Sequence, residues 1–223
     1  MLTDLFKLAI VLYEEYGIRI GLSVFAFILG LSGLWKGRVK VKSLLKLAWS
    51  KSREKETYEI IEGALTSILW KLQADRAYLF EFRGYNRQLQ PIPYRYTDCT
   101  SEVVSPAASI RPEKENLQGI DLSTIPLWVT ELSQKGEVCI SKVQSIREHD
   151  EATCKILEAQ DIQSVYAVGL ISFRRVPMGF LGVDYCHEEI ELQDEFMESL
   201  RYEALKVIGL LELGGNFSKN KKG

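Results

Sequence analysis

The sequence predicts an α+β fold in which an antiparallel sheet carries flanking helices on one face and a single transmembrane helix precedes the domain. Two apolar stripes with helical spacing, at residues 58–72 and 192–211, predict the helices. Two pairs of strand-like segments with short connections, within residues 76–97 and 162–186, predict hairpins. An uncharged run at residues 20–35 predicts the membrane span.

Composition limits the classes of function. The chain has 223 residues and is 46% hydrophobic, which is ample for a folded core. Its 28 basic and 30 acidic residues nearly cancel, so overall charge gives no basis for binding nucleic acid. The cysteines are far apart and form no C-x-x-C pair, which argues against a zinc site or a disulfide framework and favours reduced thiols: Cys99, Cys139, Cys154 and Cys186.

The apolar run from Ile20 to Trp35 contains no charge, and the stretch back to Tyr16 adds only Arg19. About 20 residues rising about 1.5 Å each as a helix would cover the roughly 30 Å of membrane hydrocarbon. We therefore expect a single-pass anchor. The alternative is an apolar core helix or a contact with another subunit.

Basic residues follow the apolar run more densely than they precede it. The positive-inside rule therefore predicts the inner membrane with the soluble part in the cytoplasm, and membrane lipid as a partner. The segment from Val41 to Glu56 is either a basic helix attracted to anionic lipid or a solvated linker. We expect an anchor at 1–36, a basic linker at 37–55, the folded domain at 56–213 and a flexible tail at 214–223.

The first half of the domain begins with the stripe at residues 58–72, which predicts a helix ending near Ala74. An alternating aromatic strand, Arg76–Arg83, leads through turn residues at 84–86 to a second strand at Ile92–Thr97. The segment Asp98–Ile125 has prolines and serines without a clear period, which predicts a long loop with one helical turn.

The second half starts with a helix from Pro126 to Gly136, for which Ser123 and Thr124 are candidate caps. A short strand at 137–141 and a helix capped by Asp150 follow. The two clearest strands, Ile162–Phe173 and Met178–Cys186, form the second hairpin, and the stripe at 192–211 forms the closing helix. One sheet covered by the first and last helices buries both stripes.

The element order, together with ALTSILWKLQADRAYLFEF at 64–82 and IQSVYAVGLISFRRVPMGFLGVDY at 162–185, resembles the GAF domain family over roughly residues 56–213. The matching positions are Ala74, Asp75 and Arg76, then Gly179, Leu181 and Gly182. This resemblance implies a sensory or regulatory module that binds a small molecule, such as a cyclic nucleotide or a tetrapyrrole, or that dimerises through its flanking helices. The cyclic-nucleotide signature of the family is not evident.

Catalysis is not expected. Cys186 and His187 are adjacent in a strand, so their side chains point to opposite faces and cannot act together as nucleophile and base. The resemblance to bilin-carrying members would require a histidine after Cys154, where Lys155 stands instead, so we expect Cys154 to be a buried thiol. Gly179 and Gly182 are expected to let a helix or a ligand approach the strand.

A non-covalent pocket on the free face of the sheet is the sharpest functional hypothesis. Aromatic walls with a few polar groups are typical of such pockets, and ordinary packing is the alternative for each residue. The candidate ligand-binding residues are Tyr94, Arg95, Tyr96, Glu102, Trp128, Tyr166 and Asp184.

Two functions remain open. The first is a membrane-tethered sensory or regulatory module that binds a small molecule or a partner protein, without catalytic output. The second is a ligand-free structural or recruiting protein that docks a partner at the membrane. A homodimer through residues 58–72 and 192–211 is a further hypothesis. Its alternative is that the sheet buries both stripes within one chain. The ligand or cofactor stays unidentified.

Overall fold

The computed structural model describes the backbone of residues 41–213 and the side chains of residues 54–213. The chain divides into two compact units, residues 1–53 and residues 54–223. The predicted membrane span, the segment before it and the tail at 214–223 lie outside the described residues. Within the described part, no helix combines the length and the apolar character needed to cross a membrane.

The domain is built on one six-stranded sheet in which every neighbouring pair is antiparallel. Its spatial order is β3-β2-β1-β6-β5-β4, so the first hairpin meets the second through β1 and β6 at the centre of the sheet. The predicted α+β class and both hairpins are confirmed. The strands are β1 (Arg76–Tyr85), β2 (Tyr94–Val104), β3 (Ile120–Asp121), β4 (Glu137–Ile140), β5 (Ser164–Ile171) and β6 (Pro177–Tyr185).

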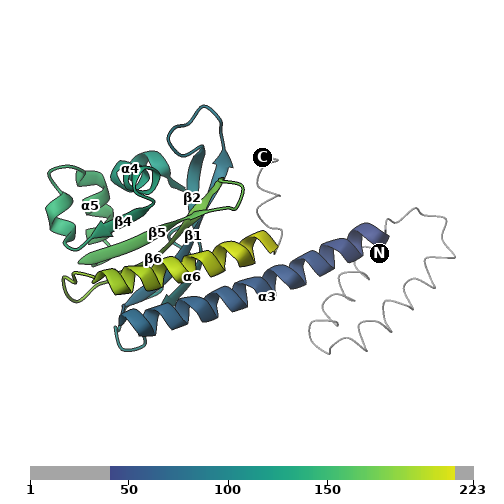
Figure 1. Ribbon diagram of the computed structural model, residues 1–223, viewed down its shortest axis with the longest axis horizontal. Coiled ribbons are helices and arrows are strands. Elements are labelled where there is room, and N and C mark those ends of the chain that lie inside the picture. The colour runs from purple at the N-terminus through teal and green to yellow at the C-terminus, as the bar shows by residue number, and fades with distance from the viewer. Residues whose placement is uncertain (1–40, 214–223) are drawn as a thin grey trace. The chain divides into compact units, whose positions relative to one another are not determined.

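Helices α3 (Val41–Leu72) and α6 (Asp194–Leu213) cover one face of the sheet, as Figure 1 shows. Their stripes are buried there against alternate strand residues, for example Leu65 and Leu200 against Leu79 and Leu181. The predicted placement of the first and last helices is confirmed. Because both stripes are buried against the sheet, a dimer would have to use other faces of these helices. The backbone of α3 is helical from Val41, which agrees with the helical alternative for the segment that follows the predicted anchor.

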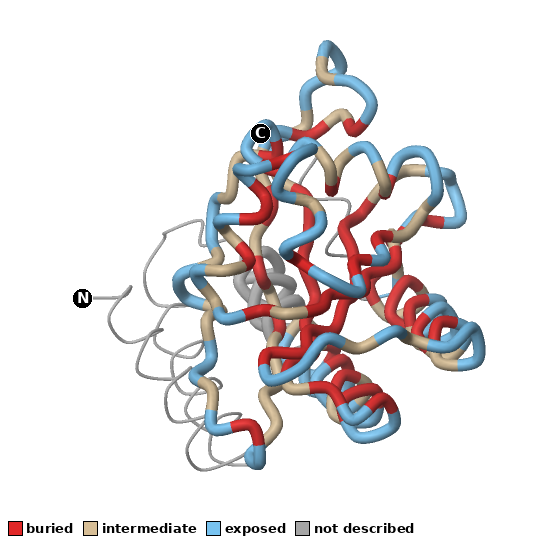
Figure 2. Tube along the Cα trace, turned by 90° about the vertical axis from the view of Figure 1, so that its left-hand side faces the viewer, coloured by how far each residue is buried: buried red, intermediate tan, exposed pale blue. Residues whose placement is uncertain are grey.

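The opposite face carries the short elements η1 (Leu122–Thr124), α4 (Pro126–Gln134), η2 (Val143–Ile146) and α5 (Glu151–Glu158). Figure 2 shows buried residues along the strands and the inner sides of the helices, with exposed residues in the loops and on the outer sides. We call the two surfaces of the sheet the α3/α6 face and the α4/α5 face.

Asp150 holds the two helices of the α4/α5 face together. It caps α5 as predicted, because its carboxylate accepts hydrogen bonds from the backbone N–H of Thr153 at 2.9 Å and from the Thr153 hydroxyl at 2.5 Å. The same carboxylate accepts the backbone N–H of Leu127 in the first turn of α4 at 3.0 Å. The prediction that Ser123 or Thr124 caps α4 is wrong, since this distant carboxylate takes that role.

Strand β2 is much longer than predicted. The segment from Asp98 to Val104 was expected to be loop, yet it pairs with β1 from Arg76 to Glu81. Its inward positions hold small polar side chains, Thr97 and Ser101, and the thiol of Cys99, all of them buried. The segment lacks the apolar alternation that identifies a strand, so only the pairing with β1 reveals it.

The two glycines of β6 make room for the neighbouring strand. A Cβ atom at Gly179 would lie 1.8 Å from the carbonyl oxygen of Phe80, and one at Gly182 would lie 2.5 Å from the ring of Tyr78. The expectation that a helix or a ligand approaches these glycines is therefore wrong. What approaches them is the backbone and one side chain of β1.

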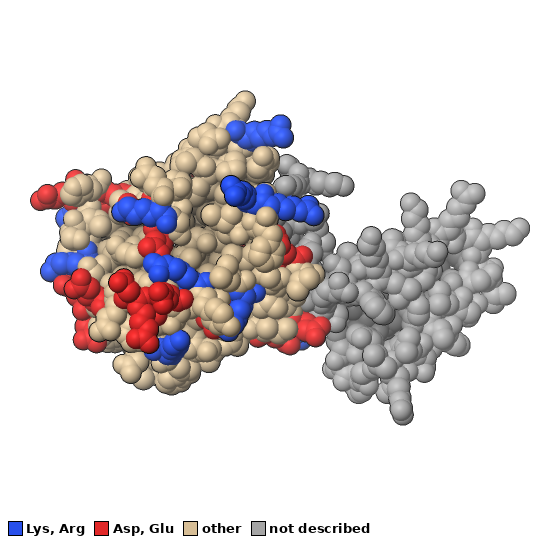
Figure 3. All heavy atoms as spheres, viewed as in Figure 1, with Lys and Arg blue, Asp and Glu red and all other residues tan. Residues whose placement is uncertain are grey.

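Acidic side chains gather where α6 begins, at the lower left of Figure 3. Negative charge in the first turn of a helix interacts favourably with the helix dipole and with the unpaired N–H groups. The exposed acidic residues around this turn are Glu188, Glu189, Glu191, Asp194 and Glu195.

Candidate ligand site on the α4/α5 face

A cavity of about 60 Å³ lies between the sheet and the short helices of the α4/α5 face. Its walls are mainly apolar and come from β1, β6, α4, α5 and the loop before β3. Polar groups from Thr97, Thr153, Gln160 and Asp184 also line it. The apolar walls include Phe80, Phe180, Trp128, Ile125, Leu157 and Ile162.

Strand alternation produces the aromatic character of this face. Tyr78, Phe80 and Phe82 are two residues apart on β1, so their rings project to the same side of the sheet. Phe80 stacks on Phe180 of β6 with ring centres 4.8 Å apart, and Trp128 of α4 meets Phe180 at 5.6 Å. These ring contacts fix the floor of the cavity and leave little freedom to the side chains that form it.

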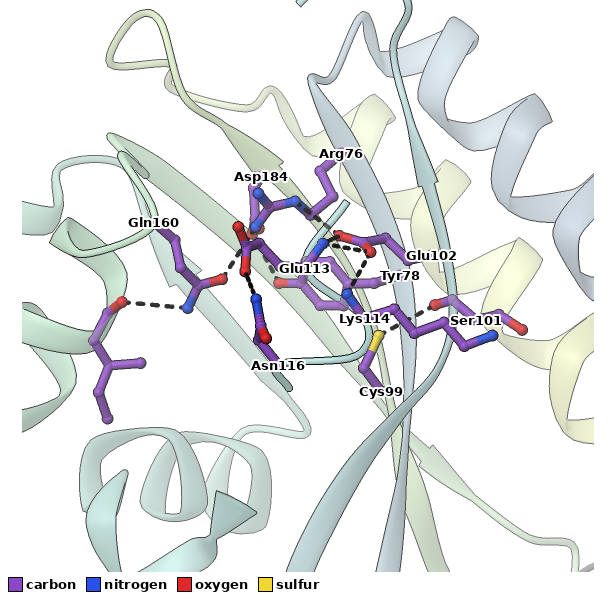
Figure 4. A network of polar contacts seen from close by, with 11 residues as sticks. Arg76, Tyr78, Cys99, Ser101, Glu102, Glu113, Lys114, Asn116, Gln160 and Asp184 are labelled. Carbon is purple, nitrogen blue, oxygen red and sulfur yellow. Dashed lines mark hydrogen bonds and ion pairs between the residues drawn. The ribbon is translucent and has the colours of Figure 1, made fainter. Parts of the chain in front are cut away.

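A buried charge network borders the cavity (Figure 4). The guanidinium of Arg76 lies between two carboxylates, with Nη1 at 3.3 Å from Oδ2 of Asp184 and Nε at 3.1 Å from Oε1 of Glu102. All three side chains are at most 2% exposed. The Tyr78 hydroxyl donates to Asp184 at 2.9 Å, and Arg76 donates to the side-chain oxygen of Gln160 at 3.1 Å.

The network holds one cation against two carboxylates, so its protonation matters. Burial raises the pKa of Asp184 to about 7, although Arg76 and the Tyr78 hydroxyl act in the opposite direction. Burial also raises the pKa of Tyr78 well above its ordinary value. Burial alone would lower the pKa of Arg76, but the charges of Asp184 and Glu102 outweigh it and raise that pKa. A proton on Asp184 would leave Arg76 and Glu102 as a balanced pair.

Glu102 connects this network to the loop that covers the cavity. Its carboxylate accepts the backbone N–H of Glu113 at 2.8 Å and of Lys114 at 2.7 Å, as Figure 4 shows. The loop is also held to β2 because the backbone N–H of Cys99 donates to the carbonyl of Leu117 at 2.8 Å. Leu117 is itself part of the cavity wall. Glu102 therefore contacts both the charge network and the loop that contributes Leu117 to the cavity wall.

Two buried side-chain donors in the described part of the chain lack a hydrogen-bond partner and an ion-pair partner. One is Nε1 of Trp128, whose ring lines the cavity and is 5% exposed. The other is the hydroxyl of Ser101 on β2. A buried N–H without an acceptor is unfavourable by about 1–3 kcal/mol, so the Trp128 donor marks a place where an acceptor is missing.

The structure brings together three of the seven candidate residues. Asp184 and Trp128 line the cavity, and Glu102 borders it through Arg76. Tyr94 packs in the same aromatic core, with its ring centre 5.7 Å from that of Phe82. Those four residues lie on the α4/α5 face or at its border, as expected.

The other three candidates lie elsewhere. Arg95 is exposed and pairs with Asp121 at 3.4 Å, while its guanidinium lies 5.0 Å above the ring of Tyr96. Tyr166 lies on the opposite, α3/α6 face, where its hydroxyl donates to the carbonyl of Ile190 at 2.5 Å. Its placement around the free face was wrong, because its neighbours in β5, Val165 and Ala167, take the α4/α5 side of the strand.

Sequence reasoning missed Arg76, Tyr78 and Gln160 as members of the site. Arg76 carried a usable signal, since a charged residue at the start of a strongly apolar strand is rarely buried without a partner. Gln160 gave no signal, because its role depends on α5 ending beside β1. Only the folded chain brings its side chain to Arg76.

Three of the four thiols, those of Cys99, Cys154 and Cys186, are buried, Cys139 is exposed, and the pKa of each thiol is raised, mainly by desolvation. Burial raises the pKa of Cys186 to about 12. Cys154 is fully buried as predicted, and its Sγ lies 3.5 Å from the carbonyl of Val143, outside the lining of the cavity. His187 faces Asp75 at 3.0 Å, which raises the pKa of the imidazole. Cys186 does not share this contact through its thiol, because only its backbone N–H reaches Asp75.

No protein-family model matches the chain, and no curated protein matches it either. Solved structures do resemble it. The blue-light absorbing form of the Thermosynechococcus elongatus PixJ GAF domain aligns with a TM-score of 0.56 and 15% identity, covering 75% of this chain and 94% of that chain. The phycocyanobilin-bound GAF domain from a cyanobacterial phytochrome aligns with a TM-score of 0.53 and 16% identity, covering 78% and 97%.

A far-red absorbing dark-state protein with bound biliverdin IXa aligns with a TM-score of 0.52 and 11% identity, covering 68% of this chain and 86% of that chain. At such low identity the likeness concerns the fold and carries no ligand or activity with it. Together with the antiparallel sheet, the two long helices on one face and the short helices on the other, these comparisons show that the chain has a GAF-like fold.

Proposed function

We propose that this chain is a membrane-tethered regulatory module whose GAF-like domain binds a small molecule in the cavity of the α4/α5 face and has no catalytic output of its own. The observation that carries the proposal is the cavity itself, which combines aromatic walls, a buried carboxylate and an unpaired indole N–H. Apolar pockets with a few convergent polar groups and a titratable group of shifted pKa are typical of binding sites.

The fold supports a sensory role, because two of the similar solved structures hold the small molecules phycocyanobilin and biliverdin. A tetrapyrrole ligand is not part of the proposal. The cavity of about 60 Å³ is far smaller than the roughly 300–1,000 Å³ of ordinary ligand pockets. Cys154 is buried away from it and is followed by Lys155.

The absence of catalysis remains part of the proposal. The thiolate is the nucleophilic form of cysteine, so burial that raises the pKa of Cys99 and of Cys186 to about 12 disfavours thiol chemistry at neutral pH. The carboxylate of Asp184 is already engaged by Arg76 and Tyr78. These contacts suit a residue that shapes a site more than one that attacks a substrate.

The membrane tether and the cytoplasmic location rest on the sequence, through the apolar run at residues 20–35 and the basic residues after it. Washing membranes with carbonate tests the tether. We expect the full chain to stay in the membrane fraction, whereas a variant with Phe25→Lys and Leu29→Lys should lose its stable insertion. Complete release of the wild-type chain would contradict an anchor.

Native mass spectrometry of the full chain, released from detergent, tests ligand binding. We expect the wild-type protein to retain a small bound mass. Leu157→Phe should fill the cavity, since Leu157 lines it, and should abolish that mass. Leu205→Phe is the matched control, because Leu205 is exposed on α6. A wild-type domain that stays empty after exposure to cell metabolites would count against the proposal.

A recruiting role is the second candidate, and one observation favours it. Helices α3 and α6 expose large apolar side chains on their outer sides, notably Trp70 at 62%, Tyr202 at 61% and Leu205 at 59%. Exposed apolar surface of this kind is typical of contacts with partners. If the domain docks a partner through this surface, the double change Trp70→Ser and Tyr202→Ser should abolish recruitment of the partner to the membrane. Any bound small molecule should stay in place.

A further inference from the structure

We propose that the cavity of the α4/α5 face takes a small, neutral, mainly apolar molecule that offers one hydrogen-bond acceptor, such as a carbonyl oxygen, to Nε1 of Trp128. This inference rests on the proposed function and deepens it by naming the chemistry of the ligand. It follows from three properties of the cavity: its unpaired donor, its paired charges and its size.

The acceptor follows from the state of the polar groups in the wall. Thr153 donates its hydroxyl to Asp150 at 2.5 Å, and Thr97 donates to the carbonyl of Glu81 at 3.2 Å. Gln160 accepts from Arg76 and donates to the carbonyl of Ile156 at 3.2 Å. Among the described residues whose side chains line the cavity, Trp128 is the one whose polar side-chain atom, Nε1, has no hydrogen-bond partner in the protein. An indole N–H only donates, so the complementary group is an acceptor.

The neutrality follows from the charges. Arg76 is engaged by both Asp184 and Glu102, so the residues that the structure describes offer an anionic ligand no free cation at the cavity. A cationic ligand meets only the carboxylate of Asp184, which already accepts from Arg76 and Tyr78. An ammonium group carries three N–H donors, and the remaining wall is apolar or already bonded. Burial of an incompletely paired charge is strongly unfavourable.

The size follows from the volume. The cavity measures about 60 Å³. A cavity of roughly 150 Å³ is known to hold benzene, so this one suits a molecule of only a few non-hydrogen atoms unless its walls move. The rings of Phe80 and Phe180 are stacked across β1 and β6, which opposes such movement. A compact ketone or aldehyde meets all three requirements.

Four probes with equal numbers of non-hydrogen atoms and similar size separate these requirements. Acetone offers an acceptor, isobutene is its apolar counterpart, acetate is an anion and isopropylammonium is a cation. The full chain in lipid nanodiscs, with ¹⁵N-labelled tryptophan side chains, is titrated with each probe, and the indole N–H signals are followed by NMR. The Trp128 signal is identified by its loss in Trp128→Phe.

We expect acetone to shift the Trp128 indole N–H signal saturably, and to bind more tightly than isobutene, by up to about tenfold, as the gain of one buried hydrogen bond implies. In Trp128→Phe, which keeps an aromatic ring and removes the N–H, the carbonyl of acetone would be buried without a donor, so the ratio of acetone to isobutene affinity should fall to one or below. Trp70→Phe is the control for an exposed tryptophan and should leave the ratio unchanged.

Three results would overturn the inference: equal binding of acetone and isobutene by the wild-type protein, tighter binding of either ion, or no saturable shift together with a bound water detected at the indole proton. The wild-type comparison decides the matter even where Trp128→Phe does not fold. A larger bound mass in native mass spectrometry would preserve the proposed function while refuting this ligand class. An empty cavity in both experiments would refute the two proposals together.

Discussion

The two faces of the sheet are built from the same strands, yet they differ in chemistry. The α3/α6 face is mainly aliphatic, and its buried tyrosines are satisfied locally: the hydroxyl of Tyr185 donates to the carbonyl of Leu72 at 2.9 Å. Its buried carboxylate, Glu81, accepts the Tyr58 hydroxyl at 2.5 Å. The α4/α5 face is aromatic, contains the cavity and leaves the N–H of Trp128 unpaired.

The difference shows how one sheet can combine a closely packed face with a face that keeps a cavity. Long helices can bury continuous apolar stripes against one face, which favours close packing. Short helices and loops cover the other face incompletely, so hollows and polar groups remain there. Successive strand residues alternate between the two faces, so the residues of one face can change without changing those of the other. Four experiments test how far this separation goes.

The largest effect is expected at the charge network. Arg76→Met would leave Asp184 and Glu102 buried without their common cation, and should lower the free energy of unfolding by about 3–5 kcal/mol, measured by urea denaturation. The control is Arg95→Met, where an exposed ion pair is removed and a change below about 1 kcal/mol is expected. Similar losses of unfolding free energy in both variants would mean that the buried network contributes no more to stability than an exposed ion pair.

Leu65→Ala tests the α3/α6 face. Leu65 is fully buried, so the change should lower the free energy of unfolding by about 2–5 kcal/mol through lost burial and a new cavity. If the faces are independent, the ratio of acetone to isobutene affinity will not change. Ile60→Ala, on the exposed side of the same helix, should have little effect on either quantity. A changed ratio in Leu65→Ala would show that the two faces are coupled.

The pH dependence tests the ionisation of Asp184. Its pKa is about 7 when folded and lies near 3.8 when exposed, so the folded state holds a proton that the unfolded state has released between these values. The stability from this proton is fully present below pH 4 and is lost as the pH rises through 7, with a slope of at most about 1.4 kcal/mol per pH unit.

Asp184→Asn should remove that slope. Acidic groups whose pKa is lowered in the fold, such as Asp150, act with the opposite sign and are present in both proteins, so the difference between the two pH profiles isolates Asp184. Urea denaturation from pH 4 to pH 8 measures it. Parallel profiles for variant and wild type would show that Asp184 is ionised throughout this range.

The smallest effect concerns the shared cap. Burial alone would raise the pKa of Asp150, but hydrogen bonds from Thr153 and Leu127 outweigh it and lower that pKa. Asp150→Ala removes acceptors from α4 and α5 together and should lower the free energy of unfolding by about 1–2 kcal/mol. Glu148→Ala, at an exposed neighbouring position, is the control. Weaker acetone binding in Asp150→Ala would show that the cap also positions the cavity walls.

Much of the fold follows from local patterns in the sequence. The stripes of α3 and α6 have helical spacing, β5 and β6 are rich in branched and aromatic residues, and Asp150 stands directly before a helix. Periodicity and capping act over a few residues, so they can be detected without knowing where the chain goes next. They were sufficient to predict the antiparallel sheet and the helices that cover one face.

The site depended on contacts between residues that are distant in sequence. The extension of β2 became a strand because β1 was available to pair with it, and Arg76 met Asp184 across 108 positions of sequence. The side of the sheet that Tyr166 takes depended on the register of β5. Only the packed tertiary structure decided where a cavity remained and which donor went unpaired, because burial and charge pairing are properties of the assembled chain.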